Sequence, residues 1–150
     1  MKITVYAAKM NKPKKINSKL SGWLSKEEAT KINVDVNNIT LYHGTSNKKS
    51  KEIDKNGLCS VIDKTYNISE GIYLTSDKEQ AYKWALRSKN KDKSEYGTIY
   101  SINGKDIKNL GCNIHPDWNM GFAGKLDNIV LLNCICIPKT KLKIIKENIW

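Results

Sequence analysis

Apolar and polar residues alternate along several short stretches of the chain, a pattern typical of strands that bury one face. Residues 39–43, 71–75 and 96–102 are predicted as strands on this basis, and residues 142–146 as the last strand. Residues 128–137 are almost wholly apolar, which predicts a strand buried on both faces.

Shorter and more polar stretches lie between these strands. Residues 2–7 and 107–114 are predicted as two further short strands. Residues 59–70, 89–95 and 113–125 are predicted as loops, because they are polar or rich in turn-forming residues. Strands and helices alternate early in the chain and strands dominate later, which argues for an α+β fold in a single domain of 150 residues.

Capping signals mark the predicted helices. A short helix is predicted to end at Gly57, because glycine readily adopts the left-handed conformation that closes a helix. Ser76 and Glu79 form a capping box that predicts a second helix, and Ser25 with Glu28 forms another. The apolar face of the helix after Ser76 is predicted to contain Ala81, Trp84 and Ala85. The helix after Ser25 is predicted to run through Ile32, with Trp23 and Leu24 anchoring its start.

Two segments resemble a known family. The sequence LYHGTS at residues 41–46 and the sequence GIYLTSDKEQAYKWA at residues 71–85 are similar to the NAD-binding half of the ADP-ribosyltransferase superfamily. The similarity is to its His-Tyr-Glu branch, which includes poly(ADP-ribose) polymerases and diphtheria-toxin-like catalytic domains. It covers residues 39–88 well and residues 96–147 only as a strand pattern, and residues 1–38 are read as a basic extension. The resemblance implies two small sheets packed together, with NAD in the cleft between them.

The resemblance assigns roles to residues of both segments. His43 is expected to hydrogen-bond a ribose hydroxyl of NAD, and the backbone of Gly44 to approach the carboxamide closely. Thr45 is expected to add a hydroxyl contact, although helix capping explains this residue equally well. Tyr73 is expected to stack on nicotinamide, and Tyr82 to form a second aromatic wall. A structural histidine and a core strand tyrosine are the ordinary alternatives for His43 and Tyr73.

The third position of the family motif is an acid at the start of a late strand. Asp127 precedes the apolar stretch and is the predicted catalytic acid, but Asn128 could occupy the aligned place instead. The loop before it contains Trp118 and Phe122, two aromatic residues expected to be exposed and to recognise the acceptor.

The activity implied is that of an NAD-dependent mono-ADP-ribosyltransferase of the toxin or effector type, with NAD as a substrate. Two alternatives stay open: an NAD glycohydrolase, in which water replaces the acceptor, and a binding module that holds NAD or ADP-ribose without turnover. An RNA 2'-phosphotransferase is disfavoured, because that enzyme usually has a histidine at the place of Tyr73. No metal site is expected, since the chain has two histidines and no CxxC motif.

Charge leaves the acceptor open between protein and nucleic acid. The formal net charge is +11, and residues 1–31 hold eight lysines against two acidic residues, so this segment is expected to attract polyanions. All but one of the 26 basic residues are lysine, which lacks the planar fork by which arginine binds phosphates.

The cysteines and the hydropathy concern the location of the protein. The sequence has no run of 18 apolar residues and no pattern of a signal peptide, so a cytosolic protein without membrane contact is expected. Cysteines in that compartment are rarely paired. The four cysteines, Cys59, Cys112, Cys134 and Cys136, are therefore expected to be reduced thiols.

Overall fold

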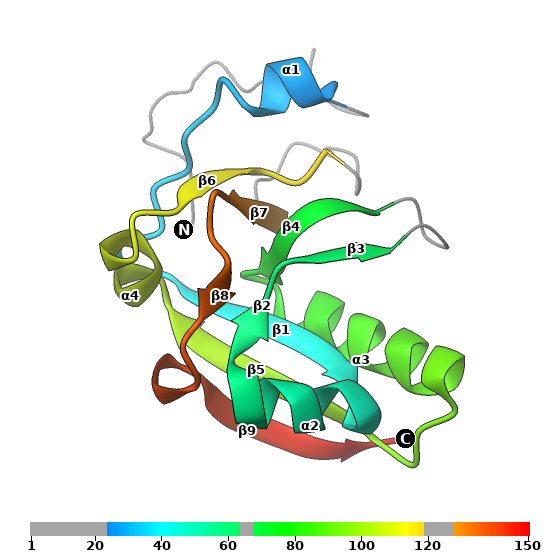
Figure 1. The fold of residues 1–150 in the computed structure, drawn as a ribbon. Coiled ribbons are helices and arrows are strands. Elements are labelled where there is room, and N and C mark those ends of the chain that lie inside the picture. Colours follow the sequence, from blue (N-terminus) through cyan, green and yellow to red (C-terminus); the bar gives the residue numbers. More distant parts are fainter. Residues whose placement is uncertain (1–23, 64–67, 119–127) are drawn as a thin grey trace.

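The computed structural model describes residues 24–63, 68–118 and 128–150 (Figure 1). These residues form an α+β fold with one large antiparallel sheet, a two-stranded sheet and short helices, which confirms the predicted class. The large sheet contains, in spatial order, β6 (Asn113–Pro116), β7 (Asn128–Leu132), β4 (Ile68–Thr75), β1 (Thr40–Ser46), β5 (Gly97–Asn103) and β9 (Lys143–Ile149).

The remaining elements cover or extend this sheet. β3 (Val61–Asp63) pairs with β4 outside the main path, and β2 (Leu58–Cys59) pairs with β8 (Cys136–Ile137). The helices are α1 (Lys26–Ala29), α2 (Asn47–Asn56), α3 (Lys78–Asp92), α4 (Gly104–Asn109) and the 3-10 helix η2 (Lys139–Lys141). In the part of the chain that the structure describes, no helix is long and apolar enough to span a bilayer.

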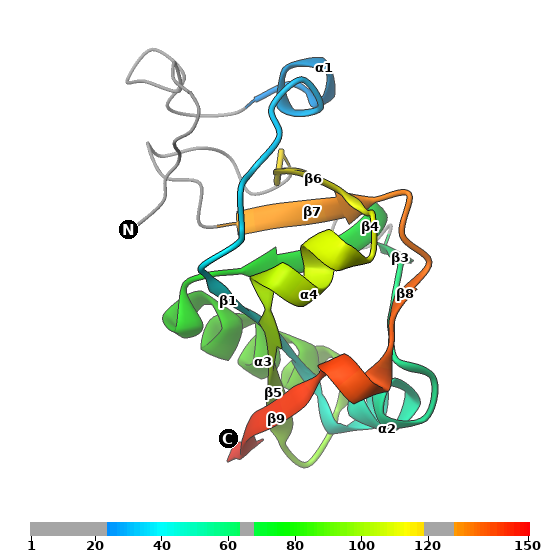
Figure 2. The ribbon, with the colours of Figure 1, turned by 90° about the vertical axis from the view of Figure 1, so that its left-hand side faces the viewer.

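The large sheet parts in its middle, between β1 and β4. These two strands share a single residue pair, Tyr42 with Thr75, whereas β1 and β5 pair along seven positions. One half of the sheet therefore consists of β6, β7 and β4, and the other of β1, β5 and β9. Figures 1 and 2 show the two halves stacked one above the other.

The main apolar core joins the two halves. It draws residues from β1, β4, β5 and β7 and from α2 and α4, and so it holds the halves together where backbone pairing is sparse. Its most deeply buried members include Leu41, Ile72, Leu74, Ile102, Ile107, Ile129, Leu131 and Ile137.

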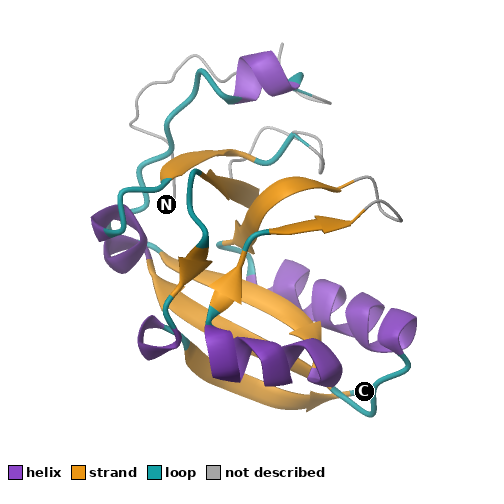
Figure 3. Cartoon of the chain, viewed as in Figure 1, coloured by secondary structure: helices purple, strands orange, loops and turns teal. Residues whose placement is uncertain are grey.

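α2 and α3 cover opposite faces of the half that contains β1 (Figures 2 and 3). α3 packs so closely on β1 that a Cβ atom at Gly44 would lie 1.9 Å from the carbonyl oxygen of Ala81. On the other face, the hydroxyl of Tyr100 donates to Asp54 of α2 at 2.8 Å. Burial raises the pKa of Tyr100, and the Asp54 carboxylate raises it further, so the hydroxyl keeps its proton.

Several predicted boundaries are confirmed. α2 ends at Gly57, which has a φ of 88° and donates its backbone N–H to Ile53. The capping box before α1 is present, because Ser25 and Glu28 each donate a backbone N–H to the other's side chain, at 2.8 and 3.0 Å. Residues 2–7 and Trp23, which were also assigned roles, lie outside the described residues.

Other element predictions are wrong for identifiable reasons. The side chain that caps α3 belongs to Asp77, not to Ser76, and α3 runs on to Asp92 through the predicted loop. Trp84 in this helix is only partly buried. The apolar stretch at residues 128–137 is broken after Leu132, because Asn133 adopts a positive φ of 57°.

Two of the predicted loops and one predicted strand are also corrected. The stretch 59–70 contains β3 and parts of β2 and β4, and the stretch 113–125 begins with β6. Residues 107–114 contain the end of α4 and the start of β6 instead of one strand. Short polar segments of this kind become strands because a neighbouring strand pairs with them, which local composition does not reveal.

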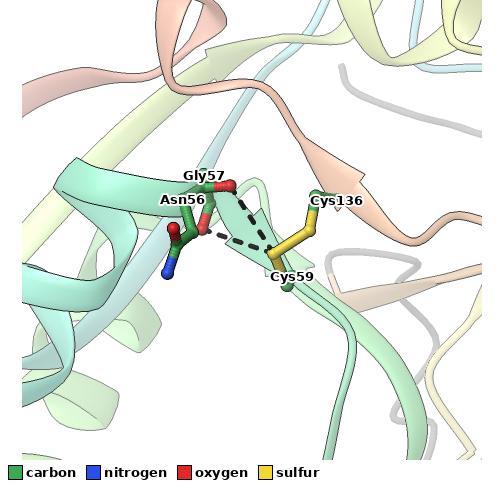
Figure 4. The surroundings of a disulfide bond; sticks show 4 residues. All are labelled: Asn56, Gly57, Cys59 and Cys136. Atoms are coloured by element: carbon green, nitrogen blue, oxygen red, sulfur yellow. Dashed lines mark hydrogen bonds between the residues drawn. A yellow bond between two sulfur atoms is a disulfide. The ribbon is translucent and has the colours of Figure 1, made fainter.

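The prediction of four reduced thiols is wrong. The structure contains the disulfides Cys59–Cys136 and Cys112–Cys134, over sequence separations of 77 and 22 residues (Figure 4). β2 and β8 pair with Cys59 directly opposite Cys136, so sheet register brings these two sulfurs together. Closing loops of this length stabilises a fold by about 3 to 5 kcal/mol in the chain-entropy view. Such bonds persist mainly in oxidising compartments, which weighs against the cytosolic location.

Replacement of Gly44 by alanine is expected to lower the free energy of unfolding by about 3 kcal/mol, because the backbone of α3 must move to admit the methyl group. Chemical denaturation measures this loss. Gly111→Ala is the matched control: its φ of 76° disfavours alanine by about 1 kcal/mol, but no atom lies within 4 Å of the added carbon. Equal losses in the two variants would contradict the close-packing explanation.

Candidate functional site

His43 reaches across the opening between the two halves of the sheet. Its Nδ1 atom lies 3.0 Å from the backbone carbonyl oxygen of Tyr73 on β4. Because a carbonyl can only accept, Nδ1 carries the proton, and the neutral ring presents Nε2 as an acceptor. The side chain thus supplies a cross-strand contact where β1 and β4 make almost none through their backbones.

The surroundings of His43 favour its neutral form. Burial lowers the pKa of His43, and the positive charge of Lys49 lowers it further. The hydrogen bond to the Tyr73 carbonyl raises the pKa, but this effect is smaller than that of burial. A neutral His43 with a free Nε2 acceptor suits hydrogen bonding to a hydroxyl group.

Tyr73 lies on the opposite face of β4 from its two neighbours. Ile72 and Leu74 belong to the main core, whereas Tyr73 belongs to a second apolar cluster. The alternation predicted for this strand is therefore confirmed. The second cluster, which we call the tyrosine cluster, consists of Leu24, Ala29, Tyr73, Trp118 and Val130.

The tyrosine cluster covers the ring that the resemblance assigns to nicotinamide. Tyr73 is 9% exposed, and the residues packed with it include Leu24 and Ala29 from the segment around α1. That segment is held to β6 by two hydrogen bonds: His115 Nδ1 donates to the Ile32 carbonyl at 2.8 Å, and Val34 N–H donates to the carbonyl of Ile114 at 3.0 Å.

Trp118 also belongs to the tyrosine cluster, and its predicted exposure is wrong. It is 9% exposed, and the Nζ atom of Lys26 lies 5.9 Å from the centre of its ring. A large aromatic side chain gains more from burial against α1 than from contact with water. Phe122, the other aromatic residue proposed for acceptor recognition, lies outside the described residues.

The start of β7 lies beside the point where the sheet parts. Asn128 is the first residue of β7 and pairs with Thr75, which in turn pairs with Tyr42 of β1. The Oδ1 atom of Asn128 is buried and has no hydrogen-bond partner among the described residues. A buried acceptor without a donor is costly, and such groups are found at functional sites. Asp127, the predicted catalytic acid, lies outside the described residues.

The remaining predicted residues lie around His43 or apart from it. Gly44 follows His43 on β1, and its lack of a Cβ is explained by the packing of α3. Thr45 is buried opposite Thr98 of β5. Tyr82 packs in a third cluster with α3 and β9, where Lys146 Nζ lies 5.1 Å from its ring centre. Tyr82 and Tyr73 therefore belong to different clusters.

Two residues of this region were not predicted from the sequence. His115 holds the segment around α1, and Asp117 is buried one residue beyond β6. The only local signal was their place in a turn-rich stretch, which says nothing about what lies opposite. Within the described ranges, no group of three or more histidine, cysteine or acidic residues is arranged to hold a metal ion.

No protein-family model and no curated protein matches this chain. The assignment of a function therefore depends on the geometry of the site and on the resemblance of the two motif segments.

Stability is expected to fall in mild acid through His43. The folded protein binds a proton at His43 less readily than the unfolded chain does, where the histidine pKa is near 6.5. Acid therefore favours the unfolded chain, and the free energy of unfolding declines as the pH drops below about 6.5, by up to about 1.4 kcal/mol per pH unit. Urea denaturation between pH 7.5 and pH 5 measures the slope.

His43→Asn is the comparison for this prediction. Asparagine keeps an N–H donor near the place of Nδ1 but does not titrate, so the difference between the two proteins isolates His43 from all other groups. Parallel pH profiles for wild type and variant would show that His43 is not the source.

Proposed function

We propose that the protein is an NAD-dependent mono-ADP-ribosyltransferase of the toxin or effector type. The observation that carries this proposal is the hydrogen bond from His43 Nδ1 to the Tyr73 carbonyl. It brings together the two motif residues, 30 positions apart in the chain, at the place where the sheet parts. Neither residue alone would support an enzymatic function, because histidines and tyrosines are common structural residues.

The arrangement of the sheet supports the finer fold assignment. The resemblance implies two small sheets with NAD between them, and the large sheet parts into two three-stranded halves at β1 and β4. We infer that NAD binds along this division. Nε2 of His43 would accept a hydrogen bond from a ribose hydroxyl, and the backbone of Gly44 would face the carboxamide of nicotinamide.

The reaction requires little covalent work from the protein. Cleavage of the bond between nicotinamide and ribose passes through an oxocarbenium-like state, as in glycoside hydrolysis. The protein must orient the ribose and place negative charge where positive charge develops. The acceptor nucleophile then bonds to C1 of the ribose, and in an NAD glycohydrolase water takes this role.

A binding module without turnover is the second candidate, and Asn128 favours it. If Asn128 occupies the third position of the motif, that position lacks a carboxylate. The acceptor is a protein or a nucleic acid, and the net charge of +11 favours an acidic or polyanionic one. Most of the N-terminal lysines that suggest a polyanion lie outside the described residues.

Incubation with labelled NAD and a cell lysate tests the proposal. Label transferred to a macromolecule supports the transferase, and protease and nuclease treatment of the labelled band identify the acceptor class. Free ADP-ribose without labelled macromolecule supports the glycohydrolase, and NAD binding without nicotinamide release supports the binding module. Absence of both binding and release would overturn the proposal.

Replacement of Tyr73 by leucine is expected to weaken NAD binding by about 1 kcal/mol, the value of an aromatic stacking contact. Leucine keeps an apolar group in the tyrosine cluster, so the fold is retained. Titration calorimetry with NAD measures the affinity. Tyr96→Leu is the control, because the Tyr96 ring packs against Trp150, 6.4 Å away between centres. Equal NAD affinity in wild type and Tyr73→Leu would exclude stacking on this ring.

Because the segment around α1 covers Tyr73, NAD can reach the ring only after the segment moves. Leu24→Asp places a charge in the tyrosine cluster and weakens the cover, so tighter NAD binding is expected in this variant. Calorimetry measures the affinity, and Glu27→Gln on the exposed side of α1 is the control. Weaker binding in Leu24→Asp than in the control would show that the segment helps to form the site.

A further inference from the structure

Asp117 is an acidic residue that the fold keeps out of water. Its exposure is 4%, and it alone is buried among the acidic residues whose burial the structure describes. Burying an ionised carboxylate costs several kcal/mol unless it is compensated. Buried acids are therefore uncommon, and they are enriched at sites that use their charge.

Backbone hydrogen bonding fixes the place of Asp117 in the sheet. β6 pairs with β7 through Pro116, opposite Ile129, and the N–H of Asp117 then donates to the carbonyl of Asn128 at 3.0 Å. Asp117 thus continues the strand pairing by one residue and lies opposite Asn128. Asn128 is opposite Thr75, so these residues form one row that ends at Tyr42, where the two halves of the sheet meet.

The same register determines the face on which Asp117 lies. Residues directly opposite each other in antiparallel strands project to the same face, as do residues two apart in one strand. Tyr73, Val130 and His115 are opposite one another, and Asp117 is two residues beyond His115. The Asp117 side chain therefore belongs to the face of the sheet that carries Tyr73. Trp118, the next residue, packs in the tyrosine cluster.

We propose that the Asp117 carboxylate supplies the negative charge that faces the ribose of NAD during cleavage. This inference rests on the proposed function, and it assigns the carboxylate that the motif segments lack. In the reaction, the bond from C1 of the ribose to the nicotinamide nitrogen breaks, and its electron pair leaves with nicotinamide. The acceptor's lone pair forms the new bond to C1 and its proton passes to water. Asp117 stabilises the positive charge in between, and nothing is oxidised or reduced.

Three aspartate variants test this assignment. In Asp117→Asn the rate of nicotinamide release at saturating NAD is expected to fall at least about 100-fold, as for the loss of one preorganised electrostatic group. NAD affinity is expected to stay within about twofold, because the interaction develops mainly in the transition state. Asp127→Asn is expected to keep the rate within about tenfold. Asp106→Asn, at the surface beside Lys141, is the control and should match wild type.

A matched pair at the same position separates charge from folding. Asp117→Glu and Asp117→Gln add the same volume, so any loss of stability is shared, and the thermal midpoint of each checks this. A rate at least about tenfold higher in the glutamate variant is the expected result. This comparison stands even if Asp117→Asn fails to fold.

The outcomes distinguish this inference from the proposed function. If wild type neither binds nor cleaves NAD, both fall. If wild type cleaves NAD and either Asp117→Asn or Asp117→Gln matches its carboxylate counterpart, the role of Asp117 is wrong and the proposed function stands. Loss of the rate in Asp127→Asn alone would return the catalytic role to Asp127.

Discussion

The hydrogen bond between the His43 ring and the Tyr73 carbonyl spans the place where the sheet would otherwise come apart. Apart from the Tyr42–Thr75 pair, β1 and β4 have no backbone pairing, so a side chain takes over the role of the strand ladder. This lets the two halves diverge while their relative position stays defined. The apolar core beneath the division stabilises the same arrangement without direction, because hydrophobic burial does not select one geometry.

The division of the sheet places backbone and side-chain groups where a ligand can meet them. In a continuous sheet the N–H and C=O groups of β1 would be bonded to β4, and Gly44 would have no free edge to offer. Parting the strands leaves those groups for a ligand, and the buried Asn128 oxygen lies at the same boundary. The tight packing of α3 keeps β1 rigid behind this edge. An unpaired edge, a fixed histidine and a rigid backing are general requirements for a site that binds a polar ligand precisely positioned against the backbone.

Local signals in the sequence predicted local structure well. Gly57 ends α2 and the box of Ser25 with Glu28 starts α1, because each depends on a few neighbouring residues. The placement of Tyr73 opposite Ile72 and Leu74 follows from strand alternation alone. What could not be predicted depends on segments far apart in the chain. Trp118 is buried by α1, the cysteines pair through the register of β2 with β8, and Asp117 gains its meaning from the residue opposite it.

The Cys59–Cys136 bond closes a covalent ring that leaves one strand outside. The ring encloses Tyr73, Asp117 and Asn128, whereas His43 on β1 precedes it in the chain. Even when the sheet opens, the strands inside the ring remain within a short distance of one another, because the tether limits their separation. β1 has no such restraint and can detach as a unit with the N-terminal segment. The oxidised chain is therefore best described as a looped scaffold into which the histidine strand inserts, and reduction of this one bond would make both partners of the site equally free.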